Sequence, residues 1–310
     1  MPQADDPMLQ SMRGTLYSVQ QRISEMMTLQ GRTLARQNAA TLTPGQLQDA
    51  EFKVFSQFGD DGIIQHLVHH LIRDRQEQRF VEFGVGNYLE SNTRFLLVNN
   101  NWQGLVMDSS CQDIDFIRSQ EFYWRHNLTA QQAWITRDNI NQLLSDAGFS
   151  GDIGLLSVDI DGNDYWVWQA IDCVRPVIVI VEWNSVFGPD AAITVPYQPQ
   201  FDRTAAHYSN LYFGASIAAL AALGTQKGYA LVGSNSAGNN LYFVRQDRLN
   251  DIPALTPQQA YIESSYRESR DVQGNLTFLA GAARRAEIAD MPVLDIHSGE
   301  LITVAHATTC

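Results

Sequence analysis

Three aspartates, Asp159, Asp161 and Asp164, follow an apolar stretch in the segment LLSVDIDGNDYWVWQAI. The stretch has the character of a buried strand, so the acids come at the edge of a core. Carboxylates gathered there repel one another, and they are costly to remove from water unless a cation, a metal ion or hydrogen-bond donors face them. The segment therefore indicates a site at the end of a strand.

A second segment with chemical potential is VEFGVGNYLESN, which places Glu82, Gly84 and Gly86 at the end of another expected strand. Glycine lets the backbone turn tightly and approach a ligand closely. Asp108 closes the next strand about 20 residues later, where a carboxylate can accept both hydroxyls of a ribose. Leu89 replaces the third glycine of the phosphate-binding pattern, which disfavours a dinucleotide. S-adenosylmethionine fits better, because nearby carboxylates favour its cationic sulfonium and amino groups.

The elements that must position these residues alternate between strands and helices from about residue 51 onward. This alternation predicts a doubly wound α/β fold, with a mostly parallel sheet covered by helices on both faces and an antiparallel final pair. We expect helices at 63–72, 90–100, 138–148, 164–171 and 214–228. We expect strands at 79–86, 103–108, 152–161, 176–184, 229–235 and 239–245.

The two ends of the chain differ from this pattern, and we predict three parts, 1–45, 46–250 and 251–310. Residues 7–38 carry a heptad-like apolar stripe and predict one amphipathic helix, which either forms an oligomerising arm or packs on its own domain. The stripe consists of Met12, Leu16, Val19, Ile23 and Met26. Residues 38–45 are expected to be a linker, and residues 293–306 a late hairpin.

Bulk properties exclude several classes of function. The net charge of -13 and the pI near 4.8 argue against non-specific binding to nucleic acid or anionic membranes. No apolar stretch is long enough to span a membrane, and the N-terminal sequence lacks the pattern of a secretory signal. Cys111, Cys173 and Cys310 form no CxxC pair, so we expect neither a zinc knuckle nor a disulfide framework, and a cytoplasmic location.

Four blocks in this order resemble the FkbM-like branch of class I S-adenosylmethionine-dependent methyltransferases. They are SQFGDDGIIQ, FVEFGVGNYLESNTRFLL, LLSVDIDGNDYWVW and VIVIVEWNSVFGP, within roughly residues 51–245. The resemblance implies a seven-stranded Rossmann-like sheet whose last strand is antiparallel. It also implies methyl transfer to a hydroxyl of a sugar, a glycan or a related small molecule. The N-terminal helical extension and the last 60 or so residues lie outside it.

The resemblance also implies roles for individual residues. Glu82, Gly84 and Gly86 would form the first cofactor loop, Asp108 would hold the ribose, and Asp159 would lie under the methionine part. Asn139 would approach the adenine. The sequence departs from the family at Asn87-Tyr88, since glycine is frequent two positions after Gly86 in this superfamily.

The acids allow two interpretations. Because the fourth and fifth strands are neighbours in such a sheet, Asp159 and Asp161 would lie beside Glu182 and Asn184 and form a site for Mg²⁺ or Ca²⁺. In the metal-free alternative, Asp159 faces the cofactor, Asp161 turns the chain with Gly162, and Asp164 starts a helix.

The loop at 185–213 follows the fifth strand, so we expect it to cover the acceptor. Within it, His207 and Tyr208 are candidate bases, and His126 is a second candidate; the alternative for both histidines is an ordinary loop residue. Two other functions stay open. A methyltransferase fold can serve as a non-catalytic scaffold assembled through the N-terminal helix, and a nicotinamide-dependent oxidoreductase can use a similar sheet.

Overall fold

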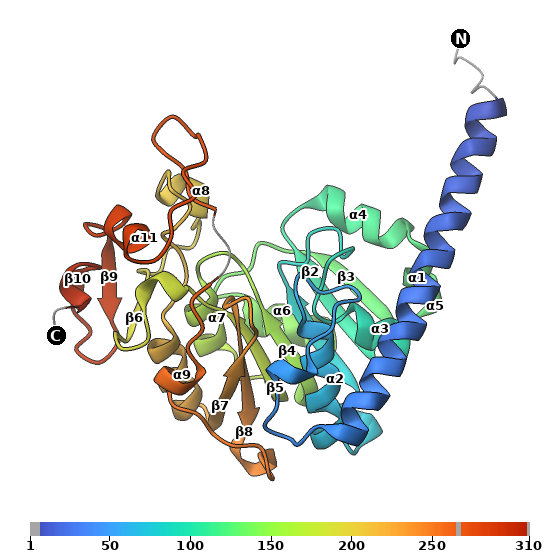
Figure 1. Cartoon of the computed structure of the whole chain (residues 1–310), viewed down its shortest axis with the longest axis horizontal. Helices are drawn as coiled ribbons and strands as arrows, with labels where there is room; N and C mark the ends of the chain where they lie inside the picture. Colours follow the sequence, from blue (N-terminus) through green and yellow to red (C-terminus); the bar gives the residue numbers. More distant parts are fainter. Residues whose placement is uncertain (1–6, 265–267, 309–310) are drawn as a thin grey trace.

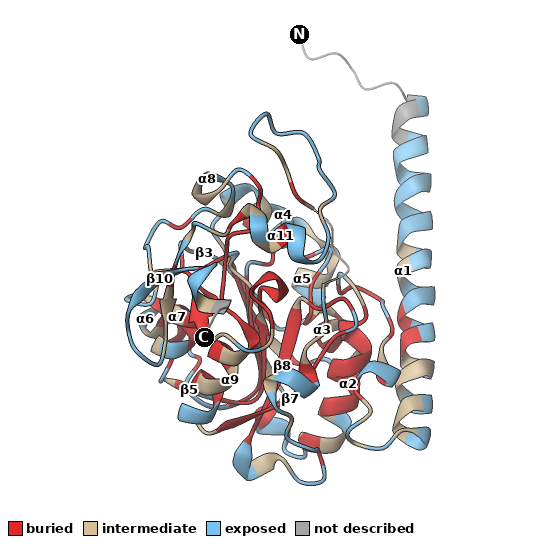
Figure 2. Ribbon diagram, turned by 60° about the vertical axis from the view of Figure 1, so that its left-hand side comes forward, coloured by how far each residue is buried: buried red, intermediate tan, exposed pale blue. Residues whose placement is uncertain are grey.

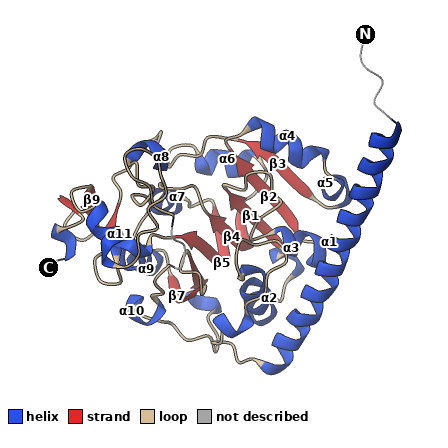
Figure 3. Cartoon of the chain, turned by 45° about the horizontal axis from the view of Figure 1, so that its top comes forward, coloured by secondary structure: helices blue, strands red, loops and turns tan. Residues whose placement is uncertain are grey.

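The structure is a computed structural model that describes residues 7–264 and 268–308. Its centre is a seven-stranded sheet with the order β3-β2-β1-β4-β5-β8-β7 (Figure 3). The first five strands are parallel, and β8 runs antiparallel to both of its neighbours, β5 and β7. The predicted fold class, a doubly wound, Rossmann-like sheet of seven mostly parallel strands, is confirmed. The strands are β1 Arg79–Phe83, β2 Gln103–Asp108, β3 Leu128–Gln132, β4 Gly151–Val158, β5 Val174–Glu182, β7 Tyr229–Ser234 and β8 Asn240–Arg245.

Helices cover both faces of this sheet, as repeated strand–helix units require. One face packs on α2 (Asp60–Leu71), α3 (Arg94–Asn100) and α4 (Cys111–Ser119). The other packs on α6 (Ile140–Asp146), α7 (Asp164–Ala170) and α9 (Ile217–Gln226). Apart from the partly exposed edge strand β3, the strands between them are largely buried, and their alternate side chains enter the two separate cores. The short helix α5 (Glu121–Arg125) follows α4.

Parallel pairing brings the carboxyl ends of the strands to one edge of the sheet. Phe83 at the end of β1 pairs with Met107 of β2, and Val158 at the end of β4 pairs with Val181 of β5. β1 has β2 on one side and β4 on the other, which makes its carboxyl end the point where the strand order reverses. Ligands of open α/β sheets bind in the crevice outside such a point.

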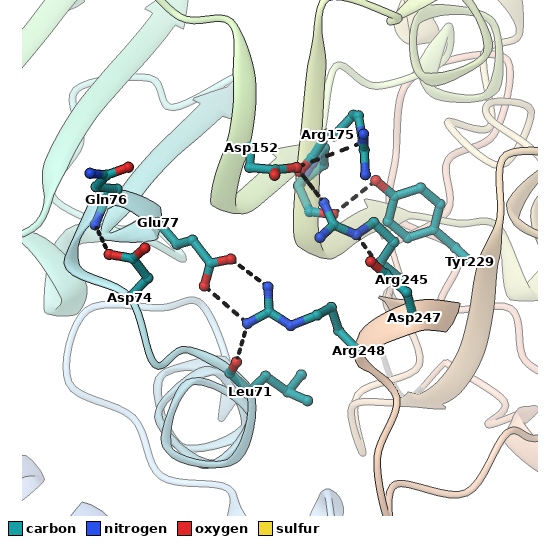
Figure 4. A network of polar contacts seen from close by, with 11 residues as sticks. Leu71, Asp74, Gln76, Glu77, Asp152, Arg175, Tyr229, Arg245, Asp247 and Arg248 are labelled. Carbon is teal, nitrogen blue, oxygen red and sulfur yellow. Dashed lines mark hydrogen bonds and ion pairs between the residues drawn. The ribbon is translucent and has the colours of Figure 1, made fainter.

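The opposite edge of the sheet is fastened by ion pairs (Figure 4). The guanidinium of Arg245 lies 2.7 Å from Asp152 and 2.7 Å from Asp247. Arg248 forms an ion pair with Glu77 and donates to the backbone oxygen of Leu71 at 2.8 Å. These contacts connect the starts of β4 and β5 to the end of β8 and to the end of α2, so they stabilise the fold at the edge away from the strand ends.

The N-terminal helix α1 (Pro7–Thr41) confirms the helix expected at 7–38. Its second half packs on the domain: a Cβ on Gly31 would lie 2.5 Å from Val54, and Arg32 donates to Asn99 at 2.8 Å. Its first half extends past the body and is largely exposed (Figures 1 and 2). No helix in the described ranges is both long enough and apolar enough to cross a membrane.

The C-terminal region forms a small second sheet with the order β10-β9-β6. β9 (Pro292–Asp295) and β10 (Leu301–Thr303) are antiparallel, which confirms the late hairpin, and β6 (Ile193–Thr194) comes from the loop after β5. The same loop carries α8 (Arg203–Ala206), and the C-terminal region adds α10 (Pro257–Ala260) and α11 (Ala282–Glu287). A separate apolar cluster joins the two regions. Cys111 and Cys173 are free thiols, and Cys310 lies outside the described residues.

Candidate active site

Two adjoining cavities lie at the carboxyl ends of the strands. The first has a volume of about 630 Å³ and lies over the ends of β1, β2 and β4. The second has a volume of about 280 Å³ and lies over the ends of β1, β4 and β5. Gly84, Asp159, Asp161 and Arg203 line both cavities. A molecule in the first cavity can therefore reach a molecule in the second across these four residues.

The loop after β1 passes close to β4 at Gly84. Its φ is +68°, and a Cβ there would lie 1.7 Å from the backbone oxygen of Asp159, so only glycine fits. Gly86 is also left-handed, and its N–H donates to Asp108 at 2.8 Å. The two glycines thus fold the loop back against the end of β2 and form a floor for the first cavity.

Asp108 lies where the sequence predicts a ribose-binding acid. One carboxylate oxygen accepts from Gly86 and the other from the N–H of Ser110 at 2.8 Å. Each carboxylate oxygen has a second lone pair, so Asp108, which also lines the first cavity, can accept two more hydrogen bonds from a ligand. The backbone contacts fix the orientation in which it does so.

Beyond Asp108, the first cavity is bounded by Trp134 and Ile135, which follow β3. Trp134 is 51% exposed, and its indole N–H donates to the backbone oxygen of Pro199 at 2.7 Å. Trp134 was not among the predicted site residues, because β3, which it follows, was not among the predicted strands. An indole face at this end of the cavity suits a flat base.

Asn139 does not line either cavity. Its side chain accepts from the N–H of Thr136 at 2.8 Å and donates to the oxygen of Trp134 at 2.9 Å. It therefore holds the turn that presents Trp134 and Ile135, and its direct contact with an adenine stays a prediction.

Negative charge dominates the first cavity. Its only cationic side chain among the described residues is Arg203, whereas six acids line it. The acids are Asp108, Asp113, Asp159, Asp161, Asp202 and Glu268. This acidic lining stabilises a cationic ligand and repels phosphate groups.

Glu82, expected in the cofactor loop, lies in the second cavity and is 4% exposed. It accepts from Ser91 Oγ at 2.6 Å and from the N–H groups of Asn92 and Thr93 at 2.8 and 3.1 Å. Burial raises its pKa, and these hydrogen bonds partly oppose the rise. Glu82 thus fastens the segment before α3 to the sheet, and its contact with the cofactor stays a prediction.

Asp159, Asp161 and Glu182 meet between the two cavities, with one oxygen of each within 4.8 Å of the others. Burial, and then the neighbouring carboxylates, raises the pKa of Asp159 and of Glu182 well above its ordinary value. Oε2 of Glu182 is buried and has no hydrogen-bond partner in the described part of the chain. Arg203 offsets the charge of Asp161 at 3.1 Å, and a proton shared between Asp159 and Glu182, or a bound cation, would relieve the remaining repulsion.

Asp164 and Asp161 have contacts that agree with the roles given to them in the metal-free interpretation. Asp164 begins α7 and accepts from the N–H groups of Ile160 and Gly162 at 2.8 and 2.9 Å, so it holds the loop. Its burial raises its pKa to about 7. Asp161 has a left-handed φ of 56° and turns the chain before Gly162, and its carboxylate lies 3.1 Å from Arg203.

The side chain of Asn184, the fourth predicted metal ligand, forms hydrogen bonds to the backbone of the loop after β5. Its amide donates to the oxygens of Leu211 and Phe213 at 2.8 and 3.0 Å, and its oxygen accepts from the N–H of Val186 at 3.1 Å. It therefore orders the loop after β5 over the second cavity. The acid cluster in the structure contains Asp159, Asp161 and Glu182 without it.

The structure does not bring the predicted bases His207 and Tyr208 to the lining of either cavity. His207 shares a hydrogen bond with Ser209 Oγ at 2.7 Å, and Tyr208 donates to Glu287 at 2.7 Å. The physical reason is the path of the loop at 185–213, which reaches the cavities with Phe201 to Thr204 and Asn210 instead. His126 shares a hydrogen bond with Asn101, and it does not line either cavity.

No model of a known protein family matches the sequence, and no curated protein matches it significantly. Several solved methyltransferases resemble the fold. The O-methyltransferase from Bacillus cereus, in complex with SAH, is 14% identical over 69% of this chain and 90% of its own, with a TM-score of 0.38. The CurJ carbon methyltransferase is 13% identical over 78% of this chain and 72% of its own, with a TM-score of 0.40.

The DszA carbon methyltransferase is 12% identical over 60% of this chain, with a TM-score of 0.37, and this chain spans about half (53%) of its length. These similarities concern the fold. Membership of the FkbM-like branch stays a prediction.

Proposed function

We propose that the protein transfers a methyl group from S-adenosylmethionine to a hydroxyl of a small molecule, a sugar or a glycan. One observation carries the proposal: an acid-lined cavity at the reversal point of the sheet meets a second cavity at Asp159 and Asp161. The first suits a cationic nucleoside on Gly84, Gly86 and Asp108. The second has room for an acceptor beside it.

Methyl transfer is a displacement in which the new oxygen–carbon bond forms as the carbon–sulfur bond breaks and sulfur keeps the electron pair. The enzyme must align the two reactants and remove the proton of the hydroxyl. Asp159 and Glu182 are the carboxylates placed between the cavities, and their raised pKa values make either a stronger base than an exposed carboxylate. We assign proton removal to this pair in preference to His207 or Tyr208.

The cluster of Asp159, Asp161 and Glu182 also fits a hard divalent cation, because it offers three carboxylate oxygens and Glu182 Oε2 is buried without a partner. Mg²⁺ or Ca²⁺ bound there would lower the pKa of an acceptor hydroxyl. In both cases the side chains of this cluster hold the reacting hydroxyl at the border of the two cavities.

Calorimetry with S-adenosylmethionine and with its demethylated product tests the proposal. We expect a Kd in the micromolar range, about -8 kcal/mol. The variant Asp108→Ala should weaken binding at least ~10-fold, since hydrogen bonds to a charged group are worth about 1.5–3 kcal/mol. Asp115→Ala on the exposed side of α4 is the matched control.

Absence of binding by the wild-type protein would overturn the proposal. Tight binding without turnover on any hydroxyl compound would instead support the scaffold alternative, and binding of NADH with a fluorescence change would support an oxidoreductase.

A further inference from the structure

The second cavity contains a buried cation that the proposed reaction does not use. Arg284 of α11 is only 6% exposed and lines this cavity. Within the described ranges, its one hydrogen bond is a long one, from Nη1 to the backbone oxygen of Ser264 at 3.4 Å, and its Nε is buried without a partner. A buried charge without a counterion is costly, and a guanidinium cannot escape the cost by losing its proton.

Two arginines, Arg203 and Arg284, line the second cavity together with the carboxylates. Burial lowers the pKa of Arg284, the charge of Glu263 opposes this fall, and the nearby charge of Arg203 adds to it. Arg203 is compensated by Asp161 at 3.1 Å and by the ring of Phe213, 3.8 Å below its guanidinium. Among the described residues Arg284 forms no ion pair, and Glu263 acts on it only through its charge, so the guanidinium can still bind a negative group in the cavity.

We propose that the second cavity binds an anionic acceptor, whose carboxylate, phosphate or sulfate group is held by Arg284. This inference rests on the proposed methyl transfer for the identity of the acceptor, and on the geometry alone for the anion subsite. A guanidinium forms paired hydrogen bonds with planar or tetrahedral oxyanions, which suits all three groups.

The charges that line the cavity then orient the acceptor. The anionic group is attracted to Arg284 and repelled by Asp159 and Glu182, so the hydroxyl end is the one that faces these carboxylates. The volume of about 280 Å³ is at the lower limit of ordinary ligand pockets, ~300–1,000 Å³. The part of the acceptor that enters is therefore small, of the size of a hydroxy acid, a sugar acid or a sugar phosphate.

The subsite is tested with an oxyanion in place of the unidentified acceptor. Crystals of the wild-type protein soaked in selenate should show anomalous density beside Nε of Arg284. In solution, sulfate should raise the Tm more than sodium chloride of equal ionic strength does, and saturably. Arg284→Gln should lose this difference and Arg284→Lys should keep part of it.

The matched control is Arg285→Gln. Arg285 is the neighbouring arginine; it donates to the backbone oxygen of Phe187 and does not line the cavity. It should keep the full response to sulfate. Anomalous density only outside the cavity, or an unchanged sulfate response in a folded Arg284→Gln variant, would overturn the inference. Calorimetry with S-adenosylmethionine on the same proteins separates the two claims, because the nucleoside and the oxyanion occupy different cavities.

Discussion

The α-carbon of Gly84 approaches the backbone of Asp159 so closely that a Cβ would lie 1.7 Å from its carbonyl oxygen. This contact joins the loop after β1 to the end of β4, the two segments that border both cavities. Backbone atoms, unlike the end of a flexible side chain, cannot shift without disturbing the strand, so the distance between the loop and the end of β4 is fixed at this point.

The first prediction compares two glycines of that loop. Gly84→Ala should displace the loop and abolish binding of S-adenosylmethionine, with a loss of stability of about 2 kcal/mol or more. Gly86→Ala is the control, because a Cβ there would meet nothing within 4 Å. This variant should lose only about 1–2 kcal/mol of stability, which is what a left-handed backbone costs a residue with a Cβ. Calorimetry and thermal melts measure both. Equal binding by the two variants would contradict the prediction.

The second prediction concerns the acid cluster. If a cation belongs there, titration of Mg²⁺ or Ca²⁺ into the wild-type protein should give saturable heat, and Glu182→Gln should weaken it at least ~10-fold, since one of three carboxylate ligands is lost. Glu90→Gln is the control, because Glu90 lines the same cavity but pairs with Lys53 at 3.4 Å. Absence of heat from the wild-type protein would assign the cluster to the metal-free interpretation.

The third prediction is a dependence of stability on pH caused by Asp60. This buried carboxylate accepts from Asn235, Asn240 and Tyr242 through Oδ1, and Oδ2 has no partner within the described residues. Burial raises its pKa above the ordinary 3.8, so the folded protein binds the proton more tightly than the unfolded chain. Its contribution to stability is therefore greatest at low pH and falls as the pH rises through the folded pKa.

The variant Asp60→Asn keeps an acceptor at Oδ1 and places a neutral amide at Oδ2. Its Tm relative to the wild type should rise as the pH increases from about 4 toward 8, by about 1–2 °C for each ~1 kcal/mol at this chain length. Asp115→Asn, at the surface, measures the effect of removing a charge alone. A constant difference in Tm over this pH range would show that Asp60 is not responsible.

The fourth prediction concerns the exposed stripe of α1. Its five residues are 46–69% exposed, and the residues that pack on the domain, such as Thr28 and Gly31, lie on another face of the helix. The stripe repeats in steps of four and three, the spacing of a two-helix seam. We therefore propose that it pairs with the stripe of a second copy. The stripe consists of Met12, Leu16, Val19, Ile23 and Met26.

Ile23→Glu should convert the dimer to a monomer in sedimentation or light scattering, because two buried carboxylates would meet at the seam. Ser18→Glu, exposed and outside the stripe, should leave the mass unchanged. A wild-type protein that is monomeric at all concentrations would remove the proposal and leave α1 as a helix of its own domain.

The sequence by itself determined six of the seven strands of the main sheet, but it did not predict β3 or α4. Alternating apolar strands and helices predicted the parallel sheet, and local signals such as Gly84, Gly86 and Asp108 marked the end of β1, where the first cavity lies, as a candidate ligand site. These signals are readable because they depend on residues close together in the chain, where glycine and a strand-terminal acid have few other reasons to occur. Asp164 was expected to start a helix, and it begins α7.

Tertiary structure decided which distant side chains share the cavities. Residues of the loop at 185–213 reach the site only through contacts with the C-terminal sheet, so the sequence suggested His207 where the fold presents Arg203. Arg284 is more than 100 positions from Glu182 yet lines the same cavity, and no local pattern marks it. Long-range packing places such residues, and its free energy comes from apolar contacts that a linear pattern does not pair.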